Sequence, residues 1–152
     1  MSTISVRTHF AAGHRILGLT GPGAKCRNIH GHTFHVTWTY AQDVGDPLEF
    51  GAVKEKLRAM IATLFDHGFI IDREDEFIGY LRAGKLKYYA LIGAPTTEAI
   101  AAEIAKHSRR ALPKAPLLSV ELREGPDNTA TWFPSISDSG PLPHVVLTGA
   151  GT

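Results

Sequence analysis

The most informative stretch of the chain is CRNIHGHTFHVTWTY, residues 26–40. In its second half apolar and polar residues alternate strictly, and the apolar face consists of Phe34, Val36, Trp38 and Tyr40. A period of two is typical of a β-strand with one face buried and the other in solvent. A His-Gly-His triplet opens this pattern, and the only cysteine of the chain stands four residues before its first histidine. The stretch therefore predicts a half-buried strand that begins beside chemically active side chains.

A similar strand pattern lies near the N-terminus. Apolar positions alternate with polar ones from Ile4 to Phe10, and His14 ends the pattern with the same parity as Phe10. Side chains two positions apart on a strand project from the same face. If the two strands pair, His14 can therefore approach the face that carries the histidines of the triplet.

Two helices and three further strands are predicted downstream. From Ala52 the apolar period changes to three and four, which indicates an amphipathic helix that ends near Asp66. Pro95-Thr96-Thr97-Glu98 is typical of a second helix start, with a threonine as N-cap and an acid in the first turn. An acidic, solvated turn or short helix is predicted at 73–77, and strands at 87–92, 117–124 and 129–133. The order β-β-α-β-α-β-β describes an α+β domain with an antiparallel sheet.

Composition limits the class of protein. The 152 residues suffice for one domain, which we place at 1–134, and the Ser-, Gly- and Pro-rich tail at 135–152 is expected to be poorly ordered. A formal net charge of +1 argues against a nucleic-acid-binding protein. No apolar run reaches the roughly 18 residues that span a bilayer, and no secretory signal opens the chain, so we expect no membrane partner. A single cysteine fits a reducing compartment and predicts a cytoplasmic protein.

Three histidines form a candidate metal site. His30 and His32 can converge on one ion because they lie two apart on a strand, and His14 can join them from the neighbouring strand. Three histidines without a fourth protein ligand describe an open, catalytic zinc site. The alternative is a set of polar residues at a strand start that are hydrogen-bonded or solvated.

Cys26 allows three interpretations. It could be a fourth zinc ligand that closes the site, or a thiol beside the ion that acts as base or nucleophile. It could also be a small buried apolar residue, the commonest role of a lone cysteine. A loop rich in glycine and basic residues does not favour the last interpretation.

Two acidic positions complete the candidate site. Asp66-His67 closes the first helix, where an imidazole either interacts with the helix terminus or acts as an acid–base group oriented by the carboxylate. Glu124 ends a strand on its apolar parity. An inward carboxylate needs a donor such as the amidine-like edge of a heterocycle, unless it simply reaches solvent at the strand end.

These motifs occur together in a known family. The chain contains, in order, Phe10-Ala11-Ala12-Gly13-His14-Arg15-Ile16, Cys26-x3-His30-Gly31-His32, Asp66-His67-Gly68, Pro95-Thr96-Thr97-Glu98 and Val120-x-Leu122-x-Glu124. It resembles the 6-pyruvoyl-tetrahydropterin synthase and 6-carboxytetrahydropterin synthase family. The resemblance runs from the first strand to about Phe133. It departs where Gly125 follows Glu124, a position at which threonine is common.

The resemblance implies a fold and an assembly. The fold is the tunnelling fold, or T-fold, an antiparallel four-stranded sheet with two helices packed on one face. In that fold subunits join sheet to sheet into an oligomeric barrel, so it implies a homo-oligomer, most commonly a hexamer. A half-covered sheet with open edges independently favours association between subunits.

The resemblance also implies the roles of individual residues. It implies a zinc ion held by His14, His30 and His32, and Cys26 as the catalytic thiol. It also implies that Asp66 and His67 form the proton relay, which acts on Cys26 of a neighbouring subunit. Glu124 matches the carboxylate that anchors the pterin ring, and Thr96, Thr97 and Glu98 match a segment that helps to hold it. Arg15, Lys25 and Arg27 surround the site in sequence and are candidate triphosphate contacts, or else ordinary solvated charges.

The implied substrate is 7,8-dihydroneopterin triphosphate. Loss of triphosphate and acetaldehyde would give 6-carboxytetrahydropterin, a precursor of deazapurines such as queuosine. Loss of triphosphate alone would give the pyruvoyl product. The Cys-x3-His-Gly-His form and the Lys87–Pro95 segment resemble the bacterial carboxy-type enzymes more closely, which favours the carboxy product. The alternative from another class is a non-catalytic oligomer that binds zinc and pterin and does not need Cys26 or His67.

Overall fold

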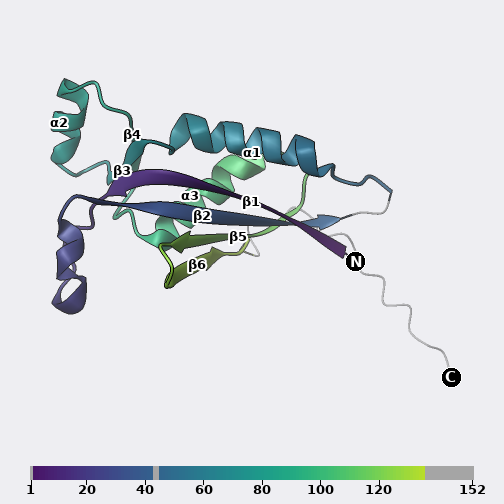
Figure 1. The fold of residues 1–152 in the computed structure, drawn as a ribbon, viewed down its shortest axis with the longest axis horizontal. Coiled ribbons are helices and arrows are strands. Elements are labelled where there is room, and N and C mark those ends of the chain that lie inside the picture. The colour runs from purple at the N-terminus through teal and green to yellow at the C-terminus, as the bar shows by residue number, and fades with distance from the viewer. Residues whose placement is uncertain (1, 43–44, 136–152) are drawn as a thin grey trace.

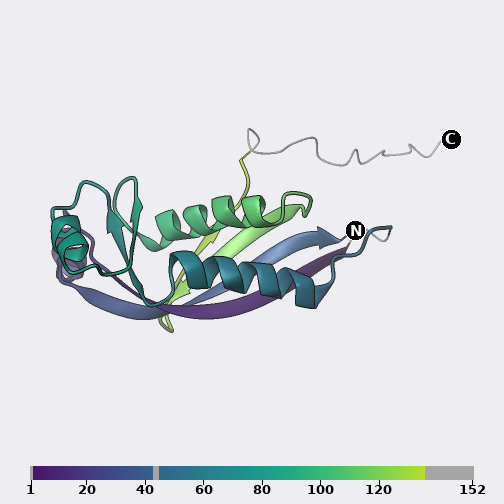
Figure 2. The same ribbon diagram turned by 90° about the horizontal axis from the view of Figure 1, so that it is seen from above.

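The computed structural model describes residues 2–42 and 45–135. Its elements follow in the order β1 (Ser2–His14), a 3-10 helix η1 (Gly21–Arg27), β2 (His30–Gln42), α1 (Phe50–Leu64), β3 (Gly68–Asp72), α2 (Phe77–Ala83), β4 (Tyr88–Leu91), α3 (Thr97–Ala111), β5 (Leu117–Glu124) and β6 (Asn128–Trp132). Helices α1 and α3 lie side by side on one face of the sheet, and η1 and α2 lie at the same end of the molecule (Figures 1 and 2). The α+β class and the two predicted helices are confirmed.

The sheet differs from the predicted antiparallel four-stranded one. It has six strands in the order β4-β3-β1-β2-β5-β6. The β1–β2, β2–β5 and β5–β6 pairs are antiparallel, whereas β3 runs parallel to both β1 and β4. Parallel neighbours need a crossover connection, and α1 and α2 supply helices on the way into β3 and β4. The four-stranded, antiparallel prediction was wrong. The sequence patterns account for five of the six strands, and β3 shows no alternation because its adjacent residues Ile70 and Ile71 are both buried.

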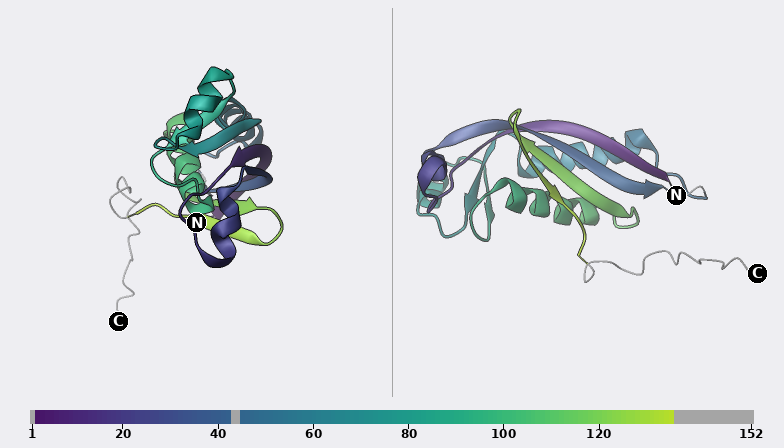
Figure 3. Two further views of the ribbon diagram at one scale, coloured as in Figure 1. Left: turned by 90° about the vertical axis from the view of Figure 1, so that its left-hand side faces the viewer. Right: turned by 90° about the horizontal axis from the view of Figure 1, so that it is seen from below.

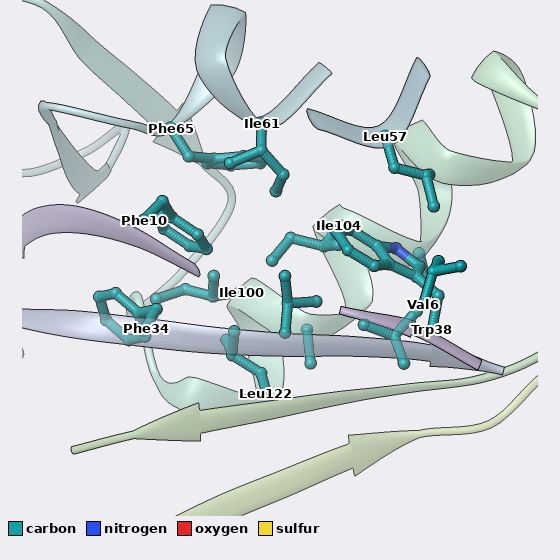
Figure 4. Close-up of a cluster of buried hydrophobic side chains, with 14 of the residues drawn as sticks. Val6, Phe10, Phe34, Trp38, Leu57, Ile61, Phe65, Ile100, Ile104 and Leu122 are labelled. Carbon is teal, nitrogen blue, oxygen red and sulfur yellow. The ribbon is translucent and has the colours of Figure 1, made fainter. Parts of the chain in front are cut away.

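The alternation predicted for the first two strands places one face in the core. The even-numbered positions of β1 and β2 point toward the helices, where Phe10 stacks on Phe34 with ring centroids 5.2 Å apart. Figure 4 shows these two rings facing Ile61 of α1 and Phe65, the residue that follows this helix. The indole of Trp38 is buried in the same layer and donates a hydrogen bond to the Ser108 hydroxyl at 2.7 Å.

The odd-numbered positions form the opposite face, which helices leave open (Figure 3). This face is polar or small in side chain along β1 and β2, as half-buried strands require. The outer edge of β1 pairs with β3 only at Ala12, Gly13 and His14, so most of that edge has no strand partner among the described residues. An open face and an unpaired edge are the features through which sheets associate.

The segment at 73–77 was predicted to be a solvated turn or short helix. The prediction of solvent exposure was wrong for one residue, Asp75. Asp75 is buried, with 6% of its surface exposed, and pairs with Arg15 across a sequence separation of 60 residues. The helix α2 that follows packs Ile78 and Leu81 against Ile71 of β3. The sequence shows no partner for the acid, because that partner lies in another part of the chain.

Two further predictions concern the limits of the domain. The tail predicted at 135–152 lies, except for Ser135, outside the described residues. Within the described part of the chain, no helix is both long and apolar enough to span a membrane.

Candidate metal centre and active site

Four side chains from three strands converge at the end of the core. In the β1–β2 register His14 lies opposite His30, and Ala12 lies opposite His32. One nitrogen from each of His14, His30 and His32 and one oxygen of Glu124 all lie within 4.8 Å of one another. The convergence predicted from strand parity is therefore present, and the group can hold a metal ion.

Hydrogen bonds to backbone carbonyls orient two of the imidazoles. His14 Nδ1 lies 2.9 Å from the carbonyl oxygen of Pro95, and His30 Nδ1 lies 2.7 Å from that of Asn28. Because a carbonyl only accepts, each Nδ1 carries the proton, and each Nε2 keeps its lone pair. A ring fixed in this way through its other nitrogen is the usual arrangement of metal-binding histidines.

One buried nitrogen of the cluster has no hydrogen-bond partner in the described part of the chain. His14 is fully buried, and its Nε2 has no hydrogen bond among the described residues. Burial lowers the pKa of His14 and outweighs the hydrogen bond to Pro95 and the nearby Glu124 carboxylate, which raise it, while the neighbouring imidazoles also lower it. Leaving a buried nitrogen unpaired is costly, and a metal ion would remove that cost. The donor set thus fits a metal such as zinc.

Glu124 lies inside this cluster. Its Oε1 is 2.9 Å from His32 Nε2, although that nitrogen has no well-directed hydrogen bond, and its Oε2 accepts a hydrogen bond from the Thr97 hydroxyl at 2.5 Å. The sequence predicted an inward carboxylate here but not its place beside the histidines. The structure therefore offers Glu124, rather than a thiol, as the fourth protein group near an ion.

Cys26 is not a member of the cluster. It lies partly buried in η1, and its backbone carbonyl accepts a hydrogen bond from Ile16 at 2.8 Å. Lys25 and Arg27 flank it and are exposed. This placement disfavours the interpretation of Cys26 as a closing metal ligand and leaves its thiol free for chemistry.

Arg15 is engaged elsewhere, which disfavours its interpretation as a triphosphate contact. Its Nε and Nη2 donate to the two oxygens of Asp75 at 2.8 and 2.5 Å, and its guanidinium lies 5.2 Å from the centre of the Phe77 ring. The hydrogen bonds from Arg15 lower the pKa of Asp75, although burial opposes them. This pair fastens α2 to the end of β1 immediately after His14.

Asp66 and His67 form a contact in the turn after α1. Asp66 Oδ2 is 2.9 Å from His67 Nδ1, and Asp66 Oδ1 accepts a hydrogen bond from the Ala11 amide at 3.0 Å. His67 has a φ of 56°, a left-handed conformation that favours glycine at the end of a helix. Strain of this kind concentrates at functional positions.

The imidazole of His67 is not part of the metal cluster. Its side chain is 83% exposed and stands beside an open depression of about 450 Å³ on the sheet face opposite the helices. The other lining residues are Ala11, Ala12, Gly13, Gly31, His32, Thr33 and Gly68. No hydrogen bond or ion pair joins His67 to Cys26 within residues 2–42 and 45–135. One chain alone therefore does not assemble the predicted relay.

The residues before α3 connect the helix to the cluster. Pro95 orients His14, the Thr96 hydroxyl caps α3 by accepting from the Ala99 amide at 3.2 Å, and Thr97 holds Glu124. Glu98 is exposed in the first turn. The Pro-Thr-Thr-Glu motif predicted the cap, but nothing in the sequence pointed to the Pro95 carbonyl as a support for a histidine.

Solved structures share this fold. The structure of 6-pyruvoyl tetrahydropterin synthase from Caenorhabditis elegans matches with a TM-score of 0.63 at 21% identity, over 88% of this chain and 96% of that one. At such low identity the similarity shows the fold alone, which is the T-fold. Fold and site together define a T-fold α+β protein with a histidine-based site that can hold a metal.

Sequence comparisons identify the family. The family model described as 6-pyruvoyl tetrahydropterin synthase matches residues 3–134, so the chain belongs to this family of pterin-processing enzymes. It is similar to two proteins named 6-carboxy-5,6,7,8-tetrahydropterin synthase. The Aquifex aeolicus protein is 32% identical over 136 residues, 76% of this chain and 83% of the relative. The Rickettsia bellii protein is 34% identical over 102 residues, 62% of this chain and 71% of the relative.

Proposed function

We propose that this protein is a zinc-dependent 6-carboxytetrahydropterin synthase of the cytoplasm. It would convert 7,8-dihydroneopterin triphosphate to 6-carboxy-5,6,7,8-tetrahydropterin with loss of acetaldehyde and triphosphate, in a route to queuosine and related deazapurines. The observation that carries the proposal is the His14–His30–His32 cluster, in which the buried Nε2 of His14 has no hydrogen bond among the described residues. The names of the relatives favour the carboxy product over the pyruvoyl one.

The three histidines would hold the zinc, with Glu124 beside them. Bound zinc would supply a Lewis acid that makes the C–H and O–H protons of the substrate side chain more labile. Glu124 would accept hydrogen bonds from the amidine-like edge of the pterin, because a carboxylate binds two adjacent N–H groups well. Thr97 keeps that carboxylate in one orientation.

Proton transfer would belong to Cys26 and His67. As a thiolate Cys26 would remove one proton, and His67, held by Asp66, would deliver or accept another. Because His67 points outward and does not contact Cys26 of its own chain, it would act on Cys26 of a neighbouring subunit. This arrangement requires a homo-oligomer, for which we propose a hexamer. Lys25 and Arg27 would contact the triphosphate.

The reaction is tested by incubating the zinc-loaded protein with 7,8-dihydroneopterin triphosphate and identifying the products by mass. Release of acetaldehyde with 6-carboxytetrahydropterin is expected. A pyruvoyl product without acetaldehyde would replace the proposed activity with the pyruvoyl synthase reaction. Binding without conversion would instead favour a zinc- and pterin-binding oligomer.

Substitution of the thiol separates catalysis from metal binding. Cys26→Ala should abolish turnover and still purify with one zinc per subunit, because the thiol lies outside the metal cluster. Zinc content by atomic emission and product formation are measured on the same preparation. Loss of zinc would make Cys26 a ligand, and full activity would remove it from the mechanism.

A further inference from the structure

Lys87 holds the turn that carries Asp66 and His67. Its Nζ donates hydrogen bonds to the backbone carbonyls of Ala62 at 2.6 Å and Asp66 at 2.7 Å. The Ala62 carbonyl belongs to the last turn of α1, where a helix leaves carbonyl groups without partners, and Asp66 lies in the turn that follows. Lys87 comes just before β4, so its side chain joins the start of that strand to a turn 21 residues earlier in the chain.

The neighbouring backbone makes room for this side chain. A Cβ placed on Gly68 would lie 3.2 Å from Lys87 Cγ and 3.2 Å from the Phe65 carbonyl oxygen. The glycine after His67 therefore allows the lysine stem to cross the turn. The Lys87 carbonyl also accepts a hydrogen bond from Phe69 at 3.1 Å, which keeps the start of the lysine side chain in place.

The other side of the turn is held by β1. The Ala11 amide donates to Asp66 Oδ1, and the His67 amide donates to the Ala11 carbonyl at 2.7 Å. The left-handed His67 thus stands between the edge of β1 and the Lys87 ammonium. If the ammonium is removed, the Asp66 carbonyl loses the hydrogen bond from Lys87 and the turn is held from one side only.

We propose that Lys87 is a positioning residue for the Asp66–His67 pair, which it orients by binding the backbone of the turn and not by touching the substrate. The inference rests on the proposed role of His67 in proton transfer. Catalytic geometry is sensitive to displacements of about 1 Å, so loosening this turn would slow the reaction without removing a reacting group.

The ammonium also acts on Asp66 through its charge. Burial raises the pKa of the Asp66 carboxyl, but hydrogen bonds from His67 and Ala11 and the charges of His67 and Lys87 bring it below its usual range. The titratable groups next to this carboxyl are thus His67 and Lys87. A neutral side chain at position 87 would bring the Asp66 pKa up, whereas an arginine would keep it low.

The test compares Lys87→Met, Lys87→Arg and the control Lys56→Met. Lys56 is an exposed lysine of α1, the helix whose end Lys87 contacts. Lys56→Met therefore removes one positive charge without touching the turn that carries Asp66 and His67. Lys87→Met should lower kcat by about tenfold with little change in KM, and Lys87→Arg should recover most of the loss. A carbon-detected NMR titration of the Asp66 carboxyl should show a raised pKa in Lys87→Met only.

A double-variant cycle separates this inference from the proposed function. In a His67→Asn background, adding Lys87→Met should cause no further loss of activity if Lys87 acts through His67. A full additional tenfold loss in that background would overturn the inference, as would an unchanged Asp66 titration in Lys87→Met. If His67→Asn is itself fully active, the proposed function of His67 fails, while the titration still tests whether Lys87 orders the turn.

Discussion

His67 illustrates how a single residue can depart from the local preference of the chain. A residue in the left-handed region is usually glycine, and here the glycine comes one residue later. The imidazole contacts Asp66 and is otherwise exposed, so its packing does not account for the conformation. The conformation is consistent with a residue retained for its chemistry, at a cost of about 1 kcal/mol or more.

The first prediction at the scale of single residues concerns the ion pair between Asp75 and Arg15. Its carboxylate accepts from Arg15 twice and from the Phe77 amide at 2.9 Å, and its side chain is only 2% exposed. Asp75→Asn should reduce the free energy of unfolding by about 3 kcal/mol. This is the lower end of the range for breaking a buried ion pair, because the Arg15 side chain stays partly exposed. Urea unfolding at pH 7 measures this loss.

The pH dependence of the same variant checks the cause. The pKa of Asp75 lies below its ordinary 3.8 in the folded protein, so its ionised form stabilises the fold above that value. This stabilisation is lost as pH falls through the lower, folded pKa. The difference in the free energy of unfolding between wild type and Asp75→Asn should therefore shrink below about pH 4. If this difference stays constant down to pH 2, the ion pair is not its source. Glu74→Gln, at a side chain 80% exposed, is the matched control and should change little.

At the scale of elements, the start of α3 connects helix stability to the site. Three consecutive residues there orient His14, cap the helix and hold Glu124. The cap is local and predictable, whereas the two contacts with the cluster join residues 81 and 27 positions apart. A displacement of this helix end would therefore affect both the metal site and the pterin-binding carboxylate.

Thr97 provides the prediction for this element. Thr97→Val keeps the shape of the side chain but removes the hydroxyl that donates to Glu124. It should raise KM for the pterin substrate about tenfold, the effect of one lost charge-assisted hydrogen bond, and leave zinc content unchanged. Thr97→Ser should behave as wild type. An unchanged KM in Thr97→Val, measured by steady-state kinetics, would show that Glu124 does not depend on this contact.

At the scale of the whole molecule, one subunit leaves its proposed relay incomplete. The cluster lies on the core side of β1 and β2, whereas His67 stands on the open side with only Asp66 as partner among the described side chains. The open face and the free edge of β1 offer the surfaces through which a second copy can approach.

Mixing of impaired subunits tests this arrangement. The homo-oligomer of Cys26→Ala should be inactive and that of His67→Asn should keep only a small residual activity, whereas co-expressed mixtures should regain a fraction of wild-type activity. The gain follows because some interfaces would pair an intact Cys26 with an intact His67. Native mass spectrometry confirms that the mixed oligomers have formed. Mixed oligomers without activity would place both residues in one chain's site.

The sequence by itself determined the β1 and β2 faces, the two long helices, the Thr96 cap and the convergence of the histidines. All of these follow from a period or a cap that neighbouring residues define. The tertiary structure alone decided the parallel strands β3 and β4, the pairing of Arg15 with buried Asp75, and the place of Glu124 beside the histidines. It also decided that Lys87 donates a hydrogen bond to the backbone carbonyl of Asp66. Each of these joins segments far apart in the chain, and the partner of a charged side chain is chosen by packing, which local sequence does not encode.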